Sequence, residues 1–402
     1  MTLGKLFVVP AMNIMGPVKD PRHEDLLDSW NRVDEHISKL FDPVYRHKFL
    51  DSRGNPLTFS WFFVNWSGFK TNPVHRDFGW FTIYDHYLSK FKNEMERYGD
   101  GMYWMYNHPA ASGIGNEWGL DWFHNSNYFE ILNRYVIERD YFPSVIQVVT
   151  EKNDASHWID NWFPFDFSNR NSFKLDLNAA EEQGKTVGDV LDWKNAPSDW
   201  SEYRPSFEDY RLRGSMNRHI FRLLDIKTRI HQITEKEIED AFIRCMNGKD
   251  TVIAAYEHDF REKADDIMDF FIKPITELAK KYPKVSWSYT NALNGAQNVC
   301  GFQNKQPPHF DVKMIHDEVR NIDAIRIRTS KTLFGPMPYV TSKDISINKF
   351  RYHPAYNIGQ HVWQVDRETI PNECVLGIAS SDIFGNVGLQ KFRIKNDIIN
   401  NI

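Results

Sequence analysis

Short apolar and aromatic runs recur along the first three quarters of the chain and are typical of buried strands. They lie at residues 6–12, 57–64, 102–106, 142–149, 221–226 and 251–256. Stretches predicted as helices separate most of them, at residues 20–48, 83–98, 126–141, 234–247 and 261–282. Such alternation of strands and helices is typical of a parallel α/β sheet or barrel.

Turn and cap signals sharpen some of these boundaries. Thr234 and Glu237 have the spacing of a capping box, and Gly248 suits the end of the helix that they begin. Pro274 predicts a kink or a break in the long helix that follows the last of these strands. Residues 207–214 are predicted as a strand or a sheet edge.

The C-terminal quarter of the chain shows a different pattern. Strand-like runs follow one another without a convincing helix between them, at residues 324–329, 345–353, 361–366, 374–379 and 387–394. This pattern predicts an all-β, sandwich-like domain at residues 303–402, with the boundary in the polar segment 303–309. The domain could extend a substrate cleft or provide the interface of a homo-oligomer.

Polar residues stand where several of the predicted strands end. They are Asn13, Asn65, Asn107, His108, His258 and Asp259. Because ligands of α/β sheets and barrels bind at the carboxyl ends of the strands, these side chains are expected to surround one binding site.

Composition places the chain among globular proteins and narrows its partners. Of its 402 residues, 41% are hydrophobic and 26% charged, and the net charge of −5 includes no basic block that would favour nucleic acid. No run is long enough for a membrane span, and the first apolar run is too short for a signal peptide, so a cytoplasmic location is expected. The cysteines Cys245, Cys300 and Cys374 lie far apart and form neither a disulfide framework nor a zinc pattern.

Aromatic residues make up 15% of the chain. Trp66 and Trp158 lie beside polar residues in stretches without a clear period, and Trp104 lies in one of the predicted strands. Their flat rings could stack on the apolar face of a sugar, and core packing is the alternative explanation. Arg76 could bind a carboxylate or a phosphate on such a sugar.

Several of these stretches resemble motifs of polysaccharide deacetylases of the NodB-homology family. Residues 57–64, Leu-Thr-Phe-Ser-Trp-Phe-Phe-Val, resemble the family's "aTfFv" strand, and the strand leading to His108 stands where the family has "G-x-E-I-G-x-H". Residues 142–147 resemble the strand that ends in a catalytic Arg ("fR-x-P"), and residues 255–259 resemble the final "L-x-H" strand. The resemblance is one of element order and short motifs, and it covers roughly residues 5–300.

The resemblance implies a fold, a reaction and catalytic residues. It implies a distorted (β/α) barrel of about seven strands at residues 1–302. The implied activity is that of a carbohydrate-active hydrolase that removes an acyl group from a sugar or a surface polysaccharide precursor. The implied catalytic residues are His108, His258 and Asp259, with His258 as the acid that protonates the leaving group. Asp259 would orient His258 or act alone, and a helix cap is its alternative role.

The chain departs from the family at the metal site. Asn13 stands at the family's first-strand Asp, Ser112 at the second His of its H-x-x-x-H segment, and Gln147 at its Arg. Amide oxygens are neutral ligands, so Asn13 and His108 would hold zinc or another divalent metal poorly, and the site is expected to be lost or rebuilt. Without a metal, His108 or an acid near it would activate the water, whereas a purely structural His108 would hydrogen-bond to hold Pro109 and the loop that follows it.

Two other functions are compatible with these residues. A glycoside hydrolase or lyase could use two loop carboxylates from the set Asp85, Glu117, Asp121, Asp154, Asp160 and Asp166. A non-catalytic sugar-binding relative would keep the cleft and lack the chemistry. In every case the predicted substrate-binding residues are Asn13, Trp66, Trp104, Asn107, Gln147, Trp158 and Arg76.

Overall fold

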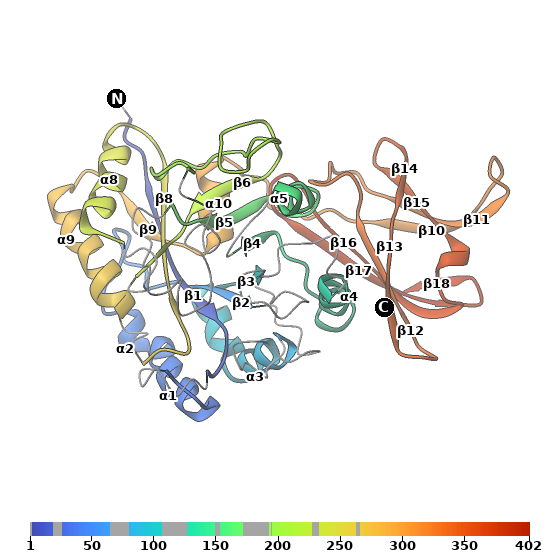
Figure 1. Ribbon diagram of the computed structural model, residues 1–402, viewed down its shortest axis with the longest axis horizontal. Coiled ribbons are helices and arrows are strands. Elements are labelled where there is room, and N and C mark those ends of the chain that lie inside the picture. Colours follow the sequence, from blue (N-terminus) through green and yellow to red (C-terminus); the bar gives the residue numbers. More distant parts are fainter. Residues whose placement is uncertain are drawn as a thin grey trace. The chain divides into compact units, whose positions relative to one another are not determined.

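The computed structural model divides the chain into two compact units (Figure 1). The barrel unit comprises residues 1–121, 145–153 and 165–302, and the sandwich unit comprises residues 122–144, 154–164 and 303–402. The residues that the structure describes are 2–18, 26–64, 80–106, 127–148, 153–171, 193, 195–226, 233–262 and 266–402. Two segments that precede residue 303 therefore belong to the same unit as the C-terminal residues.

A parallel sheet forms the core of the barrel unit. Its strands follow the order β6-β5-β4-β3-β2-β1-β8-β7, and β9 pairs with β1 outside this path. Because the two ends of the path, β6 and β7, are consecutive in the chain, the sheet curls into a nearly closed barrel. The strands are β1 (Leu6–Ile14), β2 (Ser60–Val64), β3 (Gly101–Tyr106), β4 (Val145–Val148), β5 (Phe165–Asn169), β6 (His219–Arg222), β7 (Leu224–Asp225), β8 (Thr251–His258) and β9 (Trp287–Tyr289). The predicted α/β barrel followed by an all-β region is confirmed.

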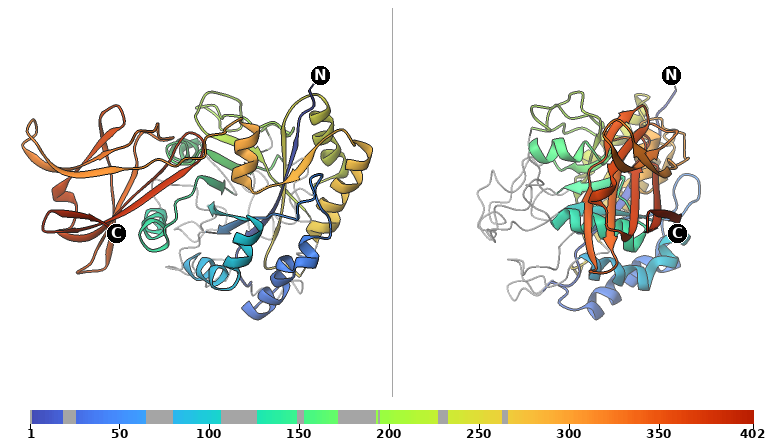
Figure 2. Two further views of the ribbon diagram at one scale, coloured as in Figure 1. Left: turned by 180° about the vertical axis from the view of Figure 1, so that it is seen from behind. Right: turned by 90° about the vertical axis from the view of Figure 1, so that its right-hand side faces the viewer.

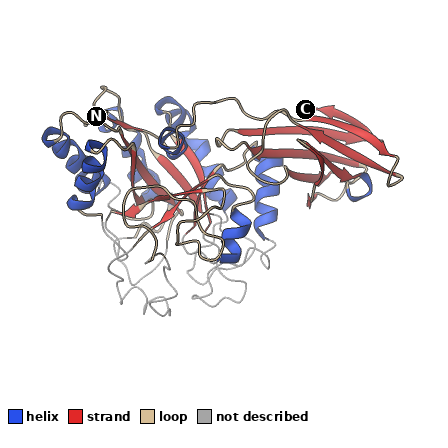
Figure 3. Cartoon of the chain, turned by 90° about the horizontal axis from the view of Figure 1, so that it is seen from above, coloured by secondary structure: helices blue, strands red, loops and turns tan. Residues whose placement is uncertain are grey.

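Helices surround the strands of the barrel unit (Figure 3). They are α1 (Trp30–Phe41), α2 (Pro43–Arg46), α3 (Trp80–Tyr98), α8 (Glu235–Met246), the π-helical η1 (Met268–Ile272), α9 (Lys273–Lys281) and α10 (Ala292–Val299). The capping box of α8 is confirmed, since the Glu237 carboxylate accepts from the Thr234 backbone N–H at 2.9 Å. Within the described ranges, no helix is long and apolar enough to cross a membrane.

The inward face of the barrel is identified by contacts between strands that are not neighbours. Phe62 of β2 packs against Phe167 of β5 with ring centroids 6.3 Å apart, although β3 and β4 separate these strands in the sheet. Phe167 also stacks on Phe221 of β6 at 4.9 Å. Alternate residues of a strand face opposite sides, and register partners in parallel strands face the same side. The inward residues of the paired strands follow from these two rules.

Helix α10 closes the amino-terminal end of this barrel. The backbone N–H of Ala292 donates to the inward hydroxyl of Ser60 at 2.9 Å, and the N–H of Leu293 donates to the hydroxyl of Tyr103 at 3.0 Å. A Cβ atom at Gly295 would lie only 3.2 Å from the inward-facing Val9 of β1 and 3.4 Å from the inward-facing Val252 of β8, so the helix packs closely on these strands. The carboxyl ends of the strands are therefore the end of the barrel at which polar strand-end residues can meet a ligand.

Two antiparallel sheets pack into a sandwich in the sandwich unit (Figure 2). One has the strand order β10-β11-β15-β14 and the other β13-β12-β16-β17-β18. Their facing side chains, among them Ile325, Trp363, Leu376 and Ile394, form one buried apolar core. The strands are β10 (Asp311–Asp317), β11 (Ile322–Arg328), β12 (Tyr339–Asp344), β13 (Lys349–His353), β14 (Tyr356–Gly359), β15 (Val362–Asp366), β16 (Glu373–Ser381), β17 (Val387–Lys395) and β18 (Ile398–Asn401), with the short 3-10 helix η2 (Arg367–Thr369).

Helix α4 (Asn127–Arg139) packs on the second of these sheets. The hydroxyl of Tyr339 donates to Asn133 Oδ1 at 2.9 Å, and Phe129 stacks on Tyr352 with centroids 4.8 Å apart. Helix α5 (Asn153–Ile159) lies almost wholly in the same unit. A strand-helix alternation along the chain therefore does not mean that each helix covers the barrel.

Two predicted strands differ from the structure. The strand predicted at 345–353 is wrong in its first half, because β12 ends at Asp344 and the carboxylate of Asp344 accepts from the backbone of Ser346 to form a turn. The strand predicted at 207–214 is also wrong. Asp209 accepts from the backbone N–H of Arg211 there, and the chain turns instead of extending.

A buried histidine is expected to make the stability of the sandwich unit depend on pH. His353 is 2% exposed, shares a hydrogen bond with Ser342 Oγ at 2.7 Å, and has its pKa lowered by burial from 6.5 to about 4. The unfolded chain therefore takes up the proton first as the pH falls. The contribution of neutral His353 to the free energy of unfolding is fully present above pH 6.5. It falls by about 3 kcal/mol in all between pH 6.5 and about pH 4.

The measurement is thermal unfolding of the wild type and His353→Gln between pH 7.5 and pH 4. The variant is expected to lose the part of the pH dependence that lies between 6.5 and 4, whereas His309→Gln, at an exposed position of the same unit, is expected to behave as the wild type. Identical pH profiles for wild type and His353→Gln would contradict this prediction.

Candidate functional site

The ends of β1 and β8 bring two predicted site residues side by side. Asn13 and His258 are register partners on these parallel strands, and Asn13 is also the partner of the inward-facing Phe62. Both side chains therefore face the barrel interior. Asn13 is buried, and its Oδ1 has no hydrogen-bond partner among the described residues. The His258 side chain is 15% exposed, and its ring lies 5.4 Å from that of Tyr256.

Gln147 adds a second amide to the same inner surface. It is the register partner of Met105, which is itself the partner of Val64, two residues beyond the inward-facing Phe62. Gln147 is fully buried, and neither its Oε1 nor its Nε2 has a partner in the described part of the chain. An unpaired buried polar group costs about 1–3 kcal/mol. Asn13 and Gln147 therefore offer hydrogen-bonding capacity that a polar ligand could use.

Asp259 faces the opposite side of β8 and is fully buried. Its carboxylate accepts from the backbone N–H groups of Met15 (2.8 Å) and Gly16 (2.9 Å) and from the hydroxyl of Tyr87 on α3 (2.9 Å). Burial, and then the charge of Asp259, raise the pKa of Tyr87, so this hydroxyl stays protonated and donates. These bonds hold the turn after β1, where Gly16 has a positive φ of 70°. The catalytic role of Asp259 stays a prediction.

Two of the tryptophans that were predicted to stack on a sugar lie in the positions of core residues. Trp104 is the register partner of Phe63, so it faces the outer side of the sheet, and it is fully buried. Trp158 belongs to the sandwich unit, where its ring lies 6.0 Å from that of Trp162 and 6.4 Å from that of Phe129. The surroundings of Trp104 and Trp158 therefore agree with core packing, which was the alternative explanation for these tryptophans. The remaining predicted site residues lie outside the described residues and stay predictions; they are Trp66, Arg76, Asn107 and His108.

A buried arginine that the sequence pattern does not predict as a site residue lies at the same end of the barrel. Arg170 directly follows β5 and is 4% exposed, and its guanidinium carbon lies 4.6 Å from the ring centroid of Tyr256 on β8. Tyr256 faces inward, because it lies two residues before His258. Its hydroxyl donates to Asp225 Oδ2 at 2.5 Å, and burial raises its pKa, so it stays protonated. Since β5 and β8 are not neighbours in the sheet, the Arg170 side chain crosses the carboxyl end of the barrel.

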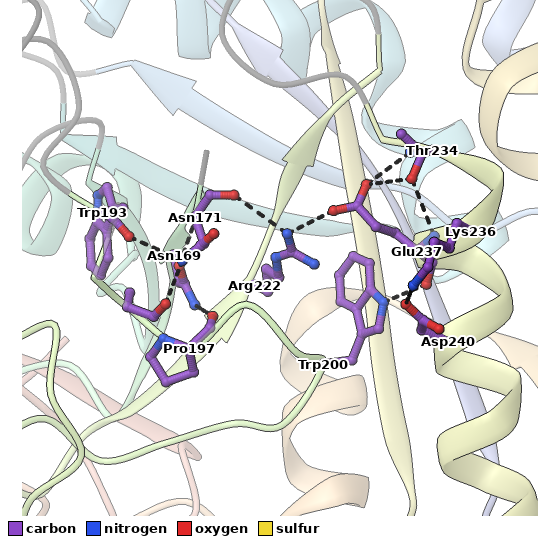
Figure 4. A network of polar contacts seen from close by, with 11 residues as sticks. Asn169, Asn171, Trp193, Pro197, Trp200, Arg222, Thr234, Lys236, Glu237 and Asp240 are labelled. Carbon is purple, nitrogen blue, oxygen red and sulfur yellow. Dashed lines mark hydrogen bonds and ion pairs between the residues drawn. The ribbon is translucent and has the colours of Figure 1, made fainter. Parts of the chain in front are cut away.

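A network of polar contacts fixes the residues on either side of Arg170 (Figure 4). The side-chain amide of Asn169 donates to the carbonyl of Pro197 at 2.7 Å, and Arg222 Nη2 donates to the carbonyl of Asn171 at 3.4 Å. The same Arg222 nitrogen forms an ion pair with a glutamate of α8 at 2.8 Å. The backbone at Arg170 is thus held by its neighbours. The only signal in the sequence was a charged residue among amides in a stretch without a clear period.

The described residues offer few ligands for the metal site that the resemblance implies. Within the described ranges, no three His, Cys, Asp or Glu side chains are grouped so as to hold a metal ion. The donor at the end of β1 is the neutral amide of Asn13. The described donor set does not fit a divalent metal, and no step of the reaction proposed below is routed through one.

The carboxylates considered for a glycoside hydrolase are dispersed. Asp166 faces the outer side of β5 and pairs with Arg218 at 3.2 Å, with both side chains fully buried. Asp160 is buried in the sandwich unit, and Asp85 is exposed on α3. Glu117 and Asp121, as well as the side chain of Asp154, lie outside the described residues. Among the described members of this set, none faces the carboxyl end of the barrel interior.

Comparison with known proteins assigns no family to the chain. No family model matches it, and no curated protein matches it significantly. The interpretation of the site therefore rests on the residues at the carboxyl end of the barrel.

Proposed function

We propose that this chain is a carbohydrate-active hydrolase that removes an acyl group from a sugar or a surface polysaccharide precursor. The observation that supports the proposal is the pair of buried amides, Asn13 and Gln147, with unmet hydrogen-bonding capacity on the inner surface that His258 shares. Hydroxyl and acylamino groups of a sugar donate and accept hydrogen bonds as amides do. Their binding would recover part of the cost of leaving these groups unpaired.

The residues suggest a division of roles in acyl hydrolysis. Water adds to the acyl carbonyl carbon, and the tetrahedral intermediate then expels the sugar nitrogen or oxygen, which takes a proton from His258. The N–H of the Gln147 amide is available to the carbonyl oxygen as negative charge develops there. His108 accepts the proton of the attacking water, as predicted from the sequence. The products are a carboxylic acid and a sugar with a free amino or hydroxyl group.

A non-catalytic sugar-binding protein is the second candidate. The observation that favours it is the amide of Asn13 at the end of β1, where the resembled family carries a carboxylate. A neutral amide binds sugar hydroxyls well and activates water poorly. In this case the barrel would keep its affinity for sugars and release no acyl group.

Acyl release and sugar binding, measured separately, test the proposal. The assay follows acetate liberated from N- and O-acetylated sugars and oligosaccharides, and calorimetry with the same compounds measures binding. His258→Gln is expected to lower the rate of release at least about 100-fold, because a general acid is lost, while affinity changes by less than about tenfold. His316→Gln, at an exposed histidine of the sandwich unit, serves as the control and is expected to match the wild type.

Each outcome decides between the candidates. If the wild type binds sugars saturably but releases no acyl group, the non-catalytic sugar-binding function replaces the hydrolase function as the proposal. Release that survives His258→Gln at the wild-type rate would remove His258 from the reaction. Elemental analysis of the purified wild type adds an independent reading, since one equivalent of zinc would indicate a rebuilt metal site at His108.

A further inference from the structure

A buried arginine lies at the carboxyl end of the barrel, and no carboxylate of the described residues forms an ion pair with it. We propose that Arg170, stacked on Tyr256, is an anion subsite, and that the sugar bound there carries a carboxylate or a phosphate group. The inference rests on the proposed function for the sugar part of the ligand. The anionic part follows from the surroundings of Arg170 alone.

The charge of Arg170 is not balanced within the described chain. The side chain is 4% exposed, its Nε and Nη2 have no hydrogen-bond partner, and no ion pair joins it to a carboxylate of the described residues. By contrast, the buried guanidinium of Arg218 pairs with Asp166 at 3.2 Å. A buried charge without a partner is costly, and folded proteins normally pair it. An anionic ligand would supply the missing partner.

The contact with Tyr256 leaves the donors of Arg170 available. The guanidinium carbon lies 4.6 Å from the ring centroid, an arrangement in which the cation uses the face of the ring. The N–H groups at the guanidinium edge are not consumed by this contact, and their fork matches a carboxylate or a phosphate. The nearby carboxylate, Asp225, accepts from the Tyr256 hydroxyl instead. Tyr256 therefore contacts Arg170 through its ring and Asp225 through its hydroxyl.

The other inward residues at this end of the barrel suit the uncharged part of the same ligand. Asn13 and Gln147 are neutral and present unpaired amide atoms, which favour hydroxyl or acylamino groups. One cation and two amides together match a polyhydroxylated molecule with one acidic group. This combination indicates an acidic or phosphorylated sugar and not a neutral one.

The test compares anionic and neutral sugars on the full chain. Thermal shift and calorimetry use glucuronate, glucose 1-phosphate, inorganic phosphate and glucose as probes. For the wild type, a rise in melting temperature is expected with one or both anionic sugars at concentrations at which glucose has no effect. Glucuronate and glucose 1-phosphate distinguish a carboxylate from a phosphate, and inorganic phosphate shows whether the anion alone suffices.

The key variant is Arg170→Met, with Arg213→Met as its matched control. Arg213 also lies over a tyrosine ring, that of Tyr203 at 5.8 Å, but it is half-exposed and pairs with Asp199. Arg170→Met is expected to weaken binding of the anionic sugars at least about tenfold, the usual effect of losing hydrogen bonds to a charged group. Its melting temperature without ligand is expected to equal or exceed that of the wild type, because an unpaired buried charge is removed. Arg213→Met is expected to bind like the wild type.

Three results would overturn the subsite. They are an equal response of the wild type to glucose and to the anionic sugars, unchanged anion binding by Arg170→Met, and a melting temperature of unliganded Arg170→Met several degrees below that of the wild type. The last would show that the arginine stabilises the fold. Acyl release from neutral sugars only would leave the hydrolase standing without the subsite. Arg170-dependent binding without acyl release would leave the subsite standing without the hydrolase.

Discussion

Replacing Asp100 by Asn is expected to lower the free energy of unfolding by about 3–5 kcal/mol, because it breaks a buried ion pair. The carboxylate accepts from Arg46 at 2.9 and 2.7 Å, from the backbone N–H of Phe59 at 2.8 Å and from Trp61 Nε1 at 2.8 Å. The side chains of Arg46 and Asp100 are both fully buried. The amide would leave the guanidinium without its counter-charge and would turn an NH₂ group toward other donors.

The aromatic rings around Arg46 do not compensate for this loss. Its guanidinium carbon lies 4.6 Å from the ring of Phe59 and 4.7 Å from that of Tyr98, and these contacts persist in the variant. They contribute about 0.5–2 kcal/mol each and cannot replace a bidentate carboxylate. Since the pair joins α2 to the start of β3, its loss is expected to loosen the amino-terminal end of the barrel first.

Urea denaturation followed by tryptophan fluorescence and circular dichroism measures the effect of Asp100→Asn. Asp240→Asn is the matched control, because Asp240 forms an exposed i,i+4 pair with Lys236 at 3.0 Å. The control is expected to change the free energy of unfolding by less than about 0.5 kcal/mol. A loss of similar size in both variants would refute the assignment of the buried pair as a main contributor to stability.

Asp259→Asn is expected to cost about 3 kcal/mol of stability and thereby to show what this carboxylate does. In the variant the amide oxygen replaces one carboxylate oxygen and the NH₂ group replaces the other. The NH₂ group would then face either the Met15 N–H, which donates to Oδ1, or both the Gly16 N–H and the Tyr87 hydroxyl, which donate to Oδ2. Each buried group left unpaired costs about 1–3 kcal/mol. The turn after β1, which leads away from Asn13, would lose its anchor to α3.

A double-mutant cycle with Tyr87→Phe measures the part of this effect that runs through the tyrosine. The two substitutions are expected to be non-additive by about 1 kcal/mol or more, because both remove the same buried hydrogen bond. Acyl release decides between a structural and a catalytic Asp259. A variant that unfolds at lower temperature but releases acyl groups near the wild-type rate below that temperature is structural. Full stability with lost turnover would support the catalytic role that sequence similarity implies.

Strands could be predicted from the sequence where a continuous run of apolar side chains marks the whole segment as buried. The apolar runs at β1 and β2 are fully buried, the run at β8 is buried up to His258, and the described side chains of β3 are buried except for Met102. Such runs form strands in almost any parallel sheet. The capping box at Thr234 is a local signal and was read correctly for the same reason. By contrast, β5 contains Asp166 and Ser168, whose polarity hides it, because their partners come from β4 and from Arg218.

The candidate site likewise has features that the sequence could predict and features that it could not. Strand-end residues such as Asn13 and His258 could be named in advance, since parallel strands of a barrel end on the same side. The burial and the facing of both side chains could not be predicted, nor could the lack of a partner for Asn13 Oδ1 among the described residues, because these depend on the register between β1, β2 and β8. Arg170 was invisible for the same reason. Its contact with Tyr256, 86 positions away in the chain, arises only in the folded protein, and nothing local marks either residue.

Local sequence thus determined the alternation of strands and helices that is typical of a parallel α/β sheet or barrel, and the change to an all-β region near residue 303. Hydrophobic periodicity and turn residues act over a few positions, and a few positions suffice for those features. Tertiary structure alone decided that α4 belongs to the sandwich unit, that Trp104 faces outward, that Asp259 anchors a turn, and that Arg170, which has no ion pair among the described residues, contacts a tyrosine of β8. Each of these depends on pairing between segments distant in sequence, where strand register and the demand that buried polar groups be paired act over the whole fold.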